Sequence, residues 1–495
     1  MINHQFTDGT ICAPATIPGT GAISIIRVSG KEALTIADKI IHLSGGSLAE
    51  TEGYRLRYGT IFEADGSVLD NVIVSVFRAP HSYTGENSVE ISCHASRFIV
   101  NSILEGLVNA GARIAAPGEF TRRAFVNGKM DLAQAEAVAD VIASQSAASH
   151  KVAMNQLKGG FSSELKSLRE KLLKMTSLLE LELDFSEEDV EFASRSELGA
   201  LVNEALSHIG RLTDSFSRGN AIKNGVPVAI VGATNTGKST LMNALLGEDR
   251  AIVSDIAGTT RDTIEETLNL GGVMFRFIDT AGIRETDEVV EKIGIERTFK
   301  KMDEASIVLG MTDLSRGENS VLADAEYIWD KVNASSSGQE FLLLVNKCDV
   351  DGCESGDGEG HVAGCAGAGY ADKAGKLAGI EAALSAKGIS AKLIPISAKT
   401  GYGLAALTET LAEIGRRITG DTDETLVTNI RHYEALVRAA TALGRVRDGL
   451  QVATLPPDLI AQDLREALYH LGEIVGEIGT EEVLGNIFRK FCIGK

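Results

Sequence analysis

Alternating apolar and polar residues dominate the first 128 positions of the chain. The runs AISIIRVSG (22–30), VIVSVFRAP (72–80) and SVEISCHAS (88–96) are rich in β-branched residues and are bordered by turn formers, a pattern that predicts strands. The run SRFIVNSILEGLVNAGA (96–112) has helical periodicity and predicts a helix. This mixture predicts an α+β domain.

A different pattern, with apolar residues every three or four positions, begins near Asp131. The segments DLAQAEAVADVIASQ (131–145) and SSELKSLREKLLKMTSLLELELDF (162–185) carry it and predict long amphipathic helices. The chain becomes helical again from Thr428. We expect the late helices to pack on the early ones and to form one discontinuous helical domain.

Between Val226 and Thr419, continuous apolar runs alternate with helical segments. Buried parallel strands have this composition, so the region predicts a doubly wound α/β domain inserted into the helical one. Residues 352–379 are rich in glycine and predict a flexible surface insertion without chemical importance. Cys353, His361 and Cys365 within it are a remote candidate for a metal site.

The fold class that these patterns predict is a multidomain α+β and α/β protein. The predicted boundaries are 1–129 for the N-terminal domain, 130–224 for the first helical part, 225–420 for the α/β domain with its insertion near 351–380, and 421–495 for the second helical part.

Composition limits the classes of protein. The 495 residues are 44% hydrophobic and 23% charged, as in globular proteins. We expect neither a signal peptide nor a membrane-spanning segment, because the sequence shows no pattern typical of either. Six cysteines, at 12, 93, 348, 353, 365 and 492, lack the spacing of a zinc site or a disulfide scaffold, which favours the reducing cytoplasm. The net charge of −20 implies that any nucleic-acid contact is local or shared with a partner.

The sequence GATNTGKST (232–240) lies between a predicted strand and a predicted helix. It matches the phosphate-loop pattern G-x-x-x-x-G-K-[ST]. Lys238 would offer a cation to β- and γ-phosphate oxygens, and Ser239 would offer a hydroxyl to Mg²⁺. The predicted nucleotide contacts here are Asn235, Thr236, Gly237, Lys238, Ser239 and Thr240.

Three shorter motifs follow in the order found in GTPases, namely DTAG (279–282), NKCD (346–349) and SAK (397–399). Asp279 could hold Mg²⁺ through water. Asp349 could accept hydrogen bonds from N1–H and N2–H of guanine, a donor pair that adenine lacks. The predicted contacts in these motifs are Asp279, Thr280, Ala281, Gly282, Asn346, Lys347, Asp349, Ser397, Ala398 and Lys399.

Two positions narrow the mechanism of hydrolysis. Ile283 stands where Ras-like GTPases have a glutamine that orients water. Asn235 and the carbonyls of the loop SDIAGTTRD (254–262) could hold a large monovalent cation against the phosphates; the alternative is that Asn235 only braces the loop. The predicted contacts in this second loop are Ser254, Asp255, Ile256, Ala257, Gly258, Thr259 and Thr260.

With these motifs the chain resembles the MnmE (TrmE) family of tRNA-modification GTPases along essentially its whole length. The resemblance extends to DGTICAPATIPGTGAISIIRVSG (8–30), SYTGENSVEIS (82–92), PGEFTRRAFVNGKMDLAQAEAVADVI (117–142), DTAGIRETDEVVEKIGIER (279–297) and CIGK (492–495). It implies an N-terminal folate-binding and dimerisation domain, a helical domain and an inserted Ras-like GTPase domain. EISCHAS departs from the family's more glycine-rich pattern, and the insertion after Asp349 is unusually long.

The resemblance also implies individual roles. Asn235 and Thr259 side chains, with the carbonyls of Ser254 and Ile256, would bind K⁺. Ser239 and Thr260 would bind Mg²⁺, and Glu291 would orient the hydrolytic water through a second water. Contacts to 5-formyltetrahydrofolate would come from Arg27, Glu90, Lys129 and Lys495.

The family further implies a homodimer, a heterotetramer with the FAD-binding partner MnmG, and tRNA as substrate. Together they would add a carboxymethylaminomethyl or aminomethyl-type group to C5 of the wobble uridine, with a one-carbon unit from tetrahydrofolate. Cys492 would be a catalytic thiol in this step, or else a small buried or inert residue.

Two other functions remain open from the residues. A ribosome-assembly GTPase would share only the GTPase domain, but no appended KH-like basic module is present. A folate-binding scaffold with a vestigial GTPase domain would not need the intact Lys238, Asp279 and Asp349.

Overall fold

The computed structural model describes residues 9–19, 21–63, 65–184, 194–249, 265–278, 304–334, 338–349, 368–420, 424–451, 456–477, 481–488, 491 and 494. They form two compact units. The first comprises Met1–Ala143, Ala153–Thr213 and Arg431–Lys495, and the second comprises Ser144–Val152 and Asp214–Ile430. Within these described ranges, no helix is both long and apolar enough to cross a membrane. The four domain boundaries expected from the sequence remain a prediction.

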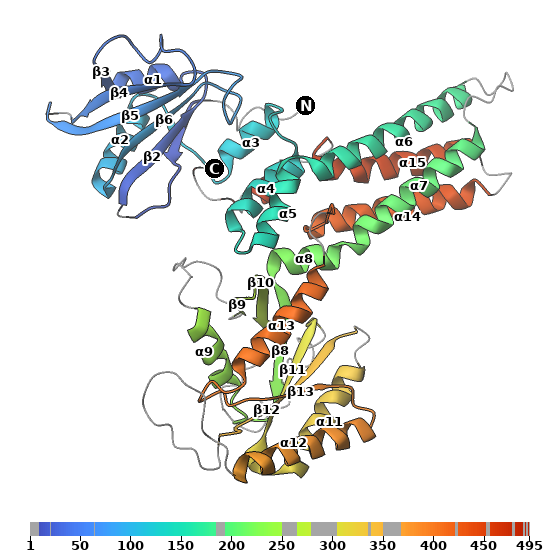
Figure 1. Ribbon diagram of the computed structural model, residues 1–495. Coiled ribbons are helices and arrows are strands. Elements are labelled where there is room, and N and C mark those ends of the chain that lie inside the picture. Colours follow the sequence, from blue (N-terminus) through green and yellow to red (C-terminus); the bar gives the residue numbers. More distant parts are fainter. Residues whose placement is uncertain are drawn as a thin grey trace, which may run out of the picture. The chain divides into compact units, whose positions relative to one another are not determined.

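A sheet of seven strands, counted over the described residues, forms the N-terminal part of the first unit (Figure 1). Its order is β3-β4-β5-β6-β2-β1-β7, and only the β1–β7 pair is parallel. Along β2, Ile26 and Val28 point into the core while Arg27 points to the opposite face, as the two-residue period of a strand requires. Helices α1 and α2 close that core. The elements are β1 Ile11–Pro14, β2 Gly21–Ser29, α1 Ala33–Ile40, β3 Ile41–Leu43, β4 Arg55–Phe62, β5 Val68–Phe77, β6 Ser88–Ala95, α2 Arg97–Asn109 and β7 Arg113–Ile114.

Helices make up the rest of the first unit. Helix α15 runs alongside α6 (Figure 1), and α16 packs on α3 and α4 through a buried cluster that includes Leu484, Phe488 and Phe491. Segments from the two ends of the chain thus share a core, which confirms the discontinuous helical domain. The helices are α3 Glu119–Val126, α4 Leu132–Ala143, α5 Ala147–Leu157, α6 Gly160–Asp184, α7 Arg195–Asp214, α14 Ile430–Gly449, α15 Pro457–Val475 and α16 Glu481–Phe488. The first part of α5, up to Val152, belongs to the second unit.

A buried cluster of charged side chains ties three of these helices together. Glu136 of α4 accepts hydrogen bonds from Nε of Arg431 at 3.0 Å and Nη2 of Arg431 at 3.1 Å, and lies 2.7 Å from Nε2 of His432. Arg431 also donates to the carbonyl oxygens of Glu473 and Ile474 in α15. Burial alone would raise the pKa of Glu136, but His432 and Arg431 outweigh it and lower the pKa to about 2. The cluster therefore stabilises the helical domain through an ionised carboxylate.

Replacing Glu136 by glutamine is expected to lower the free energy of unfolding by about 3 kcal/mol at pH 7, because it leaves Arg431 and His432 without their anion. The depressed pKa means that the stabilisation is fully present above about pH 4.5 and is lost as the pH falls towards 2. Urea unfolding of both proteins at pH 7 and pH 3 measures this. Glu434→Gln, which removes an exposed pair with Arg438, is the control and should change the free energy by less than about 0.5 kcal/mol. Equal stabilities of the Glu136→Gln variant and the native protein at pH 7 would contradict the prediction.

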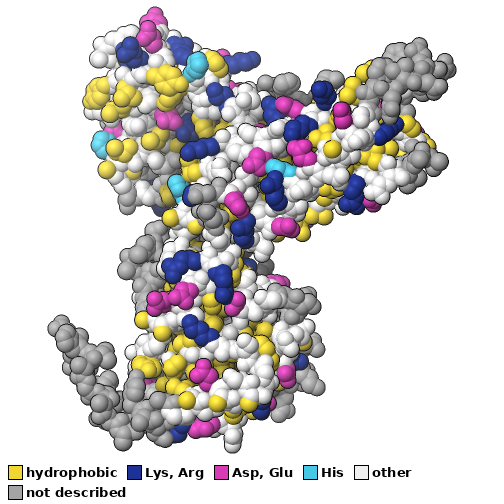
Figure 2. Space-filling model, turned by 45° about the vertical axis from the view of Figure 1, so that its right-hand side comes forward, with side chains coloured by type: hydrophobic (Ala, Val, Ile, Leu, Met, Phe, Trp, Pro, Cys, Tyr) yellow, Lys and Arg dark blue, Asp and Glu magenta, His cyan; other side chains and the backbone are white. Residues whose placement is uncertain are grey.

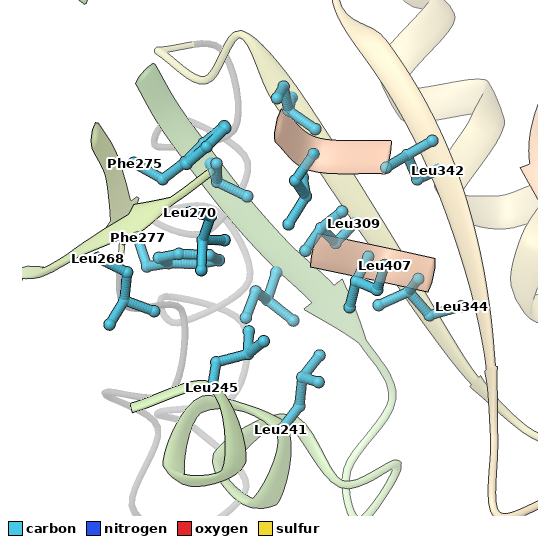
Figure 3. Packing of buried hydrophobic residues seen from close by; sticks show 14 of the residues in the cluster. Leu241, Leu245, Leu268, Leu270, Phe275, Phe277, Leu309, Leu342, Leu344 and Leu407 are labelled. Atoms are coloured by element: carbon cyan, nitrogen blue, oxygen red, sulfur yellow. The ribbon is translucent and has the colours of Figure 1, made fainter. Parts of the chain in front are cut away.

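The second unit is built on a mostly parallel sheet of six strands in the described residues, in the order β13-β12-β11-β8-β10-β9. Only β9 runs antiparallel to its neighbour. Buried leucine and phenylalanine side chains from α9, α13 and the strands fill one side of the sheet (Figure 3), and α11 and α12 cover the other side. This is the doubly wound α/β domain that the sequence predicted. The elements are α8 Phe216–Asn224, β8 Val226–Gly232, α9 Lys238–Asp249, β9 Glu265–Leu270, β10 Val273–Ile278, β11 Ile307–Asp313, the 3-10 helix η3 Leu314–Arg316, α11 Glu318–Ala334, β12 Glu340–Asn346, α12 Ala368–Ala386, β13 Lys392–Pro395 and α13 Leu404–Thr419.

The prediction that residues 352–379 form a flexible surface insertion is wrong for the second half of that segment. Helix α12 begins at Ala368 and includes the last part of that segment. Alanine, lysine and leucine favour the helix despite the glycines, and Ile380 and Leu384 pack into the core of the unit. The first half, with Cys353, His361 and Cys365, lies outside the described residues.

Candidate functional site

Two glycines, one at the end of β8 and one in the loop before α9, have no room for a side chain. A Cβ on Gly232 would lie 2.3 Å from the carbonyl oxygen of Met311, and one on Gly237 would lie 2.5 Å from Nδ2 of Asn346. Gly237 also has a φ of 101°, which favours glycine. Local packing alone therefore requires glycine at both positions, whether or not a phosphate also approaches the backbone there.

Lys238 begins α9 and folds back over this loop. Its Nζ donates hydrogen bonds to the carbonyl oxygens of Gly232 and Ala233, both at 2.8 Å. Burial lowers the pKa of the lysine. The ammonium group is thus held at the loop, where phosphate oxygens could replace the two carbonyls as its partners.

Asn235 and Thr236 divide two tasks in the same loop. Thr236 is buried, and its hydroxyl donates to the carbonyl oxygen of Ala233 at 2.9 Å. Asn235 is exposed and has a left-handed φ of 62°, a conformation that asparagine tolerates better than most residues. Thr236 thus braces the loop, and the role of Asn235 remains a prediction. Ser239 and Thr240, in the first turn of α9, are also exposed.

Asn346 joins the phosphate loop to two other loops at the same edge of the sheet. Its Nδ2 donates to the carbonyl oxygen of Thr236 at 2.7 Å, and its Oδ1 accepts from the backbone N–H of Ala398 at 3.0 Å. Asp349, three residues on, is half-buried. The motifs at 232–240, 346–349 and 397–399 are therefore brought together, as expected for strand ends in a doubly wound sheet.

Several predicted site residues lie outside the described residues, so the structure says nothing about them. They are Ser254, Asp255, Ile256, Ala257, Gly258, Thr259, Thr260, Asp279, Thr280, Ala281, Gly282, Glu291, Cys492 and Lys495. Their roles remain predictions.

Arg27 and Glu90, from the N-terminal domain, lie directly opposite each other on β2 and β6. Nε of Arg27 donates to Oε1 of Glu90 at 2.9 Å. The guanidinium carbon lies 5.2 Å from the ring centre of Tyr83 and 5.6 Å from that of Phe120, within the range of cation–π attraction. The pair therefore lies against these two aromatic rings, on the face of the sheet that points away from the core of α1 and α2.

Lys129 is not in direct contact with that pair. Its Nζ donates to the carbonyl oxygen of Pro80 at 3.0 Å, at the start of the loop that carries Tyr83. Gly494 approaches from another side: it is buried, its φ is 99°, and a Cβ on it would lie 2.0 Å from the carbonyl oxygen of Pro14. Pro14 ends β1, the strand that pairs with β2 and lies next to Arg27.

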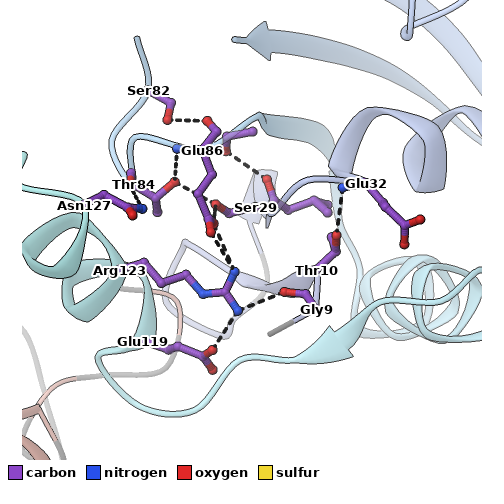
Figure 4. Close-up of polar contacts among 12 residues, drawn as sticks. Gly9, Thr10, Ser29, Glu32, Ser82, Thr84, Glu86, Glu119, Arg123 and Asn127 are labelled. Atoms are coloured by element: carbon purple, nitrogen blue, oxygen red, sulfur yellow. Dashed lines mark hydrogen bonds and ion pairs between the residues drawn. The ribbon is translucent and has the colours of Figure 1, made fainter. Parts of the chain in front are cut away.

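A buried network of polar side chains holds the loop of Tyr83 and helix α3, which carries Phe120, in position (Figure 4). Arg123 of α3 is almost inaccessible to solvent and pairs with Glu86 and Glu119, both at 3.0 Å. Ser29 of β2 donates to Glu86 at 2.8 Å. The loop of Tyr83 and the helix of Phe120 are thus cross-linked to each other and to the strand of Arg27.

The sequence prediction missed Tyr83, Phe120 and Asp313. The two aromatic residues lie in segments that carry the family resemblance, but only the fold shows that they meet Arg27. Asp313 ends β11 beside Asn346, which ends β12, and it pairs with Lys347. An aspartate that closes a buried strand was a usable signal for it.

The fold and the arrangement of these loops define a P-loop GTP-binding protein. Two family models match the chain: the MnmE helical domain over residues 132–492 and the GTP-binding protein TrmE N-terminus over residues 10–129. The chain belongs to the MnmE (TrmE) family of tRNA modification GTPases. It is a GTPase with a role in tRNA modification.

Full-length relatives agree with this assignment. The tRNA modification GTPase MnmE of Parabacteroides distasonis is 50% identical over 98% of this chain and 100% of its own length. Those of Bacteroides fragilis and Porphyromonas gingivalis are 50% and 47% identical, over 98% and 100% of this chain and 99% and 100% of their own lengths. A solved GTP-binding protein of Sulfolobus solfataricus covers 51% of this chain and 67% of its own at 18% identity, with a TM-score of 0.29, too low to bear on the fold.

Proposed function

We propose that this GTPase is K⁺-dependent and that, with an FAD-binding partner of the MnmG type, it adds a carboxymethylaminomethyl or aminomethyl-type group to C5 of the wobble uridine of certain tRNAs. The one-carbon unit comes from a tetrahydrofolate bound by the N-terminal domain. GTP hydrolysis drives association and opening of the GTPase domains rather than the carbon chemistry. Since its substrate is tRNA, the protein works in the cytoplasm.

The observation that carries this proposal is the contact between Gly494 and Pro14. It lies between one residue of the signature segment CIGK (492–495) and the end of the strand beside Arg27, which belongs to another signature segment. Glu90 offers a carboxylate to the amide and amino edge of a pterin, and Arg27 and Lys129 offer cations to folate carboxylates. Tyr83 is half-buried and offers apolar surface to a ring, while the fully buried Phe120 packs against Arg27.

The donor atoms of the phosphate loop support the proposed metal ions. Ser239 is exposed at the start of α9 and offers the hydroxyl that Mg²⁺ prefers, with Thr260 as its second protein ligand. Asn235 offers an amide oxygen for K⁺ at an exposed, left-handed position, together with Thr259 and the carbonyls of Ser254 and Ile256. Such a cation would stabilise negative charge that develops on the phosphates, and Glu291 would orient the water.

A homodimer is supported by the exposed face of the N-terminal sheet. On this face Leu56, Tyr58 and Ile73 are 70%, 61% and 49% exposed, and Tyr58 lies opposite Ile73 in the β4–β5 register. Figure 2 shows hydrophobic side chains gathered on this part of the first unit. Contiguous apolar surface of this kind marks a protein interface, and we propose that a second copy of the chain covers it.

GTP hydrolysis is expected to be about tenfold faster in K⁺ than in Na⁺, because the smaller ion fits a cage of carbonyl and amide oxygens poorly. Asn235→Ala should remove the difference while Asn243→Ala, at an exposed position of α9, should keep it. Steady-state phosphate release in the two chlorides, at equal ionic strength, is the measurement. Equal rates for the native protein would rule out the cation.

The whole function is tested by nucleoside analysis of tRNA from a strain that lacks this protein. Loss of the modified wobble uridine supports the proposal. Normal modification, with a defect in ribosomal subunits, would favour the alternative of a ribosome-assembly GTPase. Normal modification and no measurable GTP hydrolysis by the purified protein would favour a folate-binding scaffold.

A further inference from the structure

We propose that Asp313 is a positioning residue for the guanine base and that it acts through Lys347. The inference rests on the proposed base-binding role of residues 346–349. It follows from the way that two neighbouring strands end.

Strands β11 and β12 are parallel neighbours, and Asp313 is paired with Asn346 in their register. Both side chains are buried. The residue after Asn346 is Lys347, whose Nζ donates to Oδ2 of Asp313 at 2.6 Å. The ion pair thus links the end of one strand to the turn that follows the other.

Lys347 occupies an unfavourable backbone conformation. Its φ is 63°, a left-handed value that is uncommon for a residue other than glycine, asparagine or aspartate. This turn lets Asn346 point inward, to Thr236 and Ala398, before the chain reaches Asp349. A contact that holds the Lys347 side chain therefore also holds the turn between the two base-binding residues.

Both carboxylate oxygens of Asp313 accept hydrogen bonds, so the side chain is fixed in position and can orient Lys347. Oδ1 accepts hydrogen bonds from the backbone N–H of Ser315 at 2.9 Å and from its hydroxyl at 2.6 Å, so Oδ2 is left for Lys347. Burial alone would raise the pKa of Asp313, but the bonds from Lys347 and Ser315 lower it. The group is therefore an anion at neutral pH, and the pair aligns the Lys347 alkyl chain at the edge where the base is expected to bind.

The test is a double-mutant cycle on the full-length protein, with the dissociation constant of GDP as the readout. Asp313→Asn keeps an acceptor for Ser315 but loses the charge, and Lys347→Gln removes the cation. Each is expected to weaken GDP binding about tenfold, and the double variant should be no weaker than either single one. Lys387→Gln, which breaks an ion pair with Glu326 in the same unit, should leave GDP binding unchanged.

Unchanged GDP affinity in Asp313→Asn would overturn the inference. So would a loss of about a hundredfold in the double variant, the product of the two single losses. In that case Asp313 would act independently of Lys347, for example by holding η3. Unfolding midpoints without nucleotide identify a misfolded variant. If one single variant misfolds, the other decides the question alone, because unchanged GDP affinity in that variant would overturn the inference. Asp349→Asn in the same assay separates this inference from its premise, because unchanged affinity there would mean that residues 346–349 do not bind the base at all.

Discussion

Replacing Gly494 by alanine is expected to reduce wobble-uridine modification more than tenfold and to leave K⁺-stimulated GTP hydrolysis unchanged. A Cβ at this position would lie 2.0 Å from the carbonyl oxygen of Pro14, and the φ of 99° is unfavourable for alanine. Gly494 would therefore be displaced from Pro14, at the end of the strand beside Arg27. Mass spectrometry of tRNA nucleosides from a complemented deletion strain, with phosphate release by the purified variant, measures both parts.

Gly485→Ala provides the matched control. Gly485 lies within α16, where an added Cβ would meet no heavy atom within 4 Å other than those of the adjoining residues and of its own helix backbone, so both activities should remain normal. Cys492→Ser and deletion of residues 492–495 should also lose modification and keep hydrolysis, and the deletion should in addition weaken binding of 5-formyltetrahydrofolate. Normal modification in Gly494→Ala would contradict the positional role of the segment. Normal modification in Cys492→Ser would remove only the chemical role of the thiol.

Asp349→Asn is expected to weaken GTP binding by roughly a hundredfold or more and to erase most of the discrimination against ATP. In the proposed role the carboxylate would accept hydrogen bonds from N1–H and N2–H of guanine, and an amide in its place would set a donor against one of these donors. Xanthine carries an oxygen where guanine carries the amino group, so the variant should bind XTP better than the native protein does. Competition against a fluorescent nucleotide gives all three affinities.

The control for this substitution is Asp330→Asn, which changes an exposed aspartate of α11 in the same unit. Its three affinities should match those of the native protein. Unaltered preference for GTP over ATP in Asp349→Asn would show that another group selects the base.

The periodicity of the chain was sufficient for its architecture. Strands of the second unit, such as β11, are buried along their whole length, and β11 is apolar up to Met311 for that reason, whereas β2 alternates because one face is open. Two nucleotide motifs begin where a strand ends: the phosphate loop at the last residue of β8 and NKCD at the last residue of β12. Local sequence is enough there because backbone geometry at the end of a strand is itself local.

The same reasoning failed for α12. Glycine-rich composition indicated an insertion without regular structure, yet residues from Ala368 form a helix. Burial of Ile380 and Leu384 against the sheet supplies a free energy that local propensity does not contain. Composition alone could not reveal a partner surface that is built by other segments.

By itself, the sequence determined the fold class, the order of the helical and α/β segments and the identity of the nucleotide motifs, because periodicity and motif spacing are properties of neighbouring residues. Only the tertiary structure decided which distant residues meet: Arg27 with Tyr83 and Phe120, Asp313 with Lys347, and Gly494 with Pro14. Gly494 and Pro14 are separated by almost the entire chain. Their contact depends on how α16 packs against α3 and α4, and such long-range packing is set by the complementarity of whole surfaces and not by any local pattern.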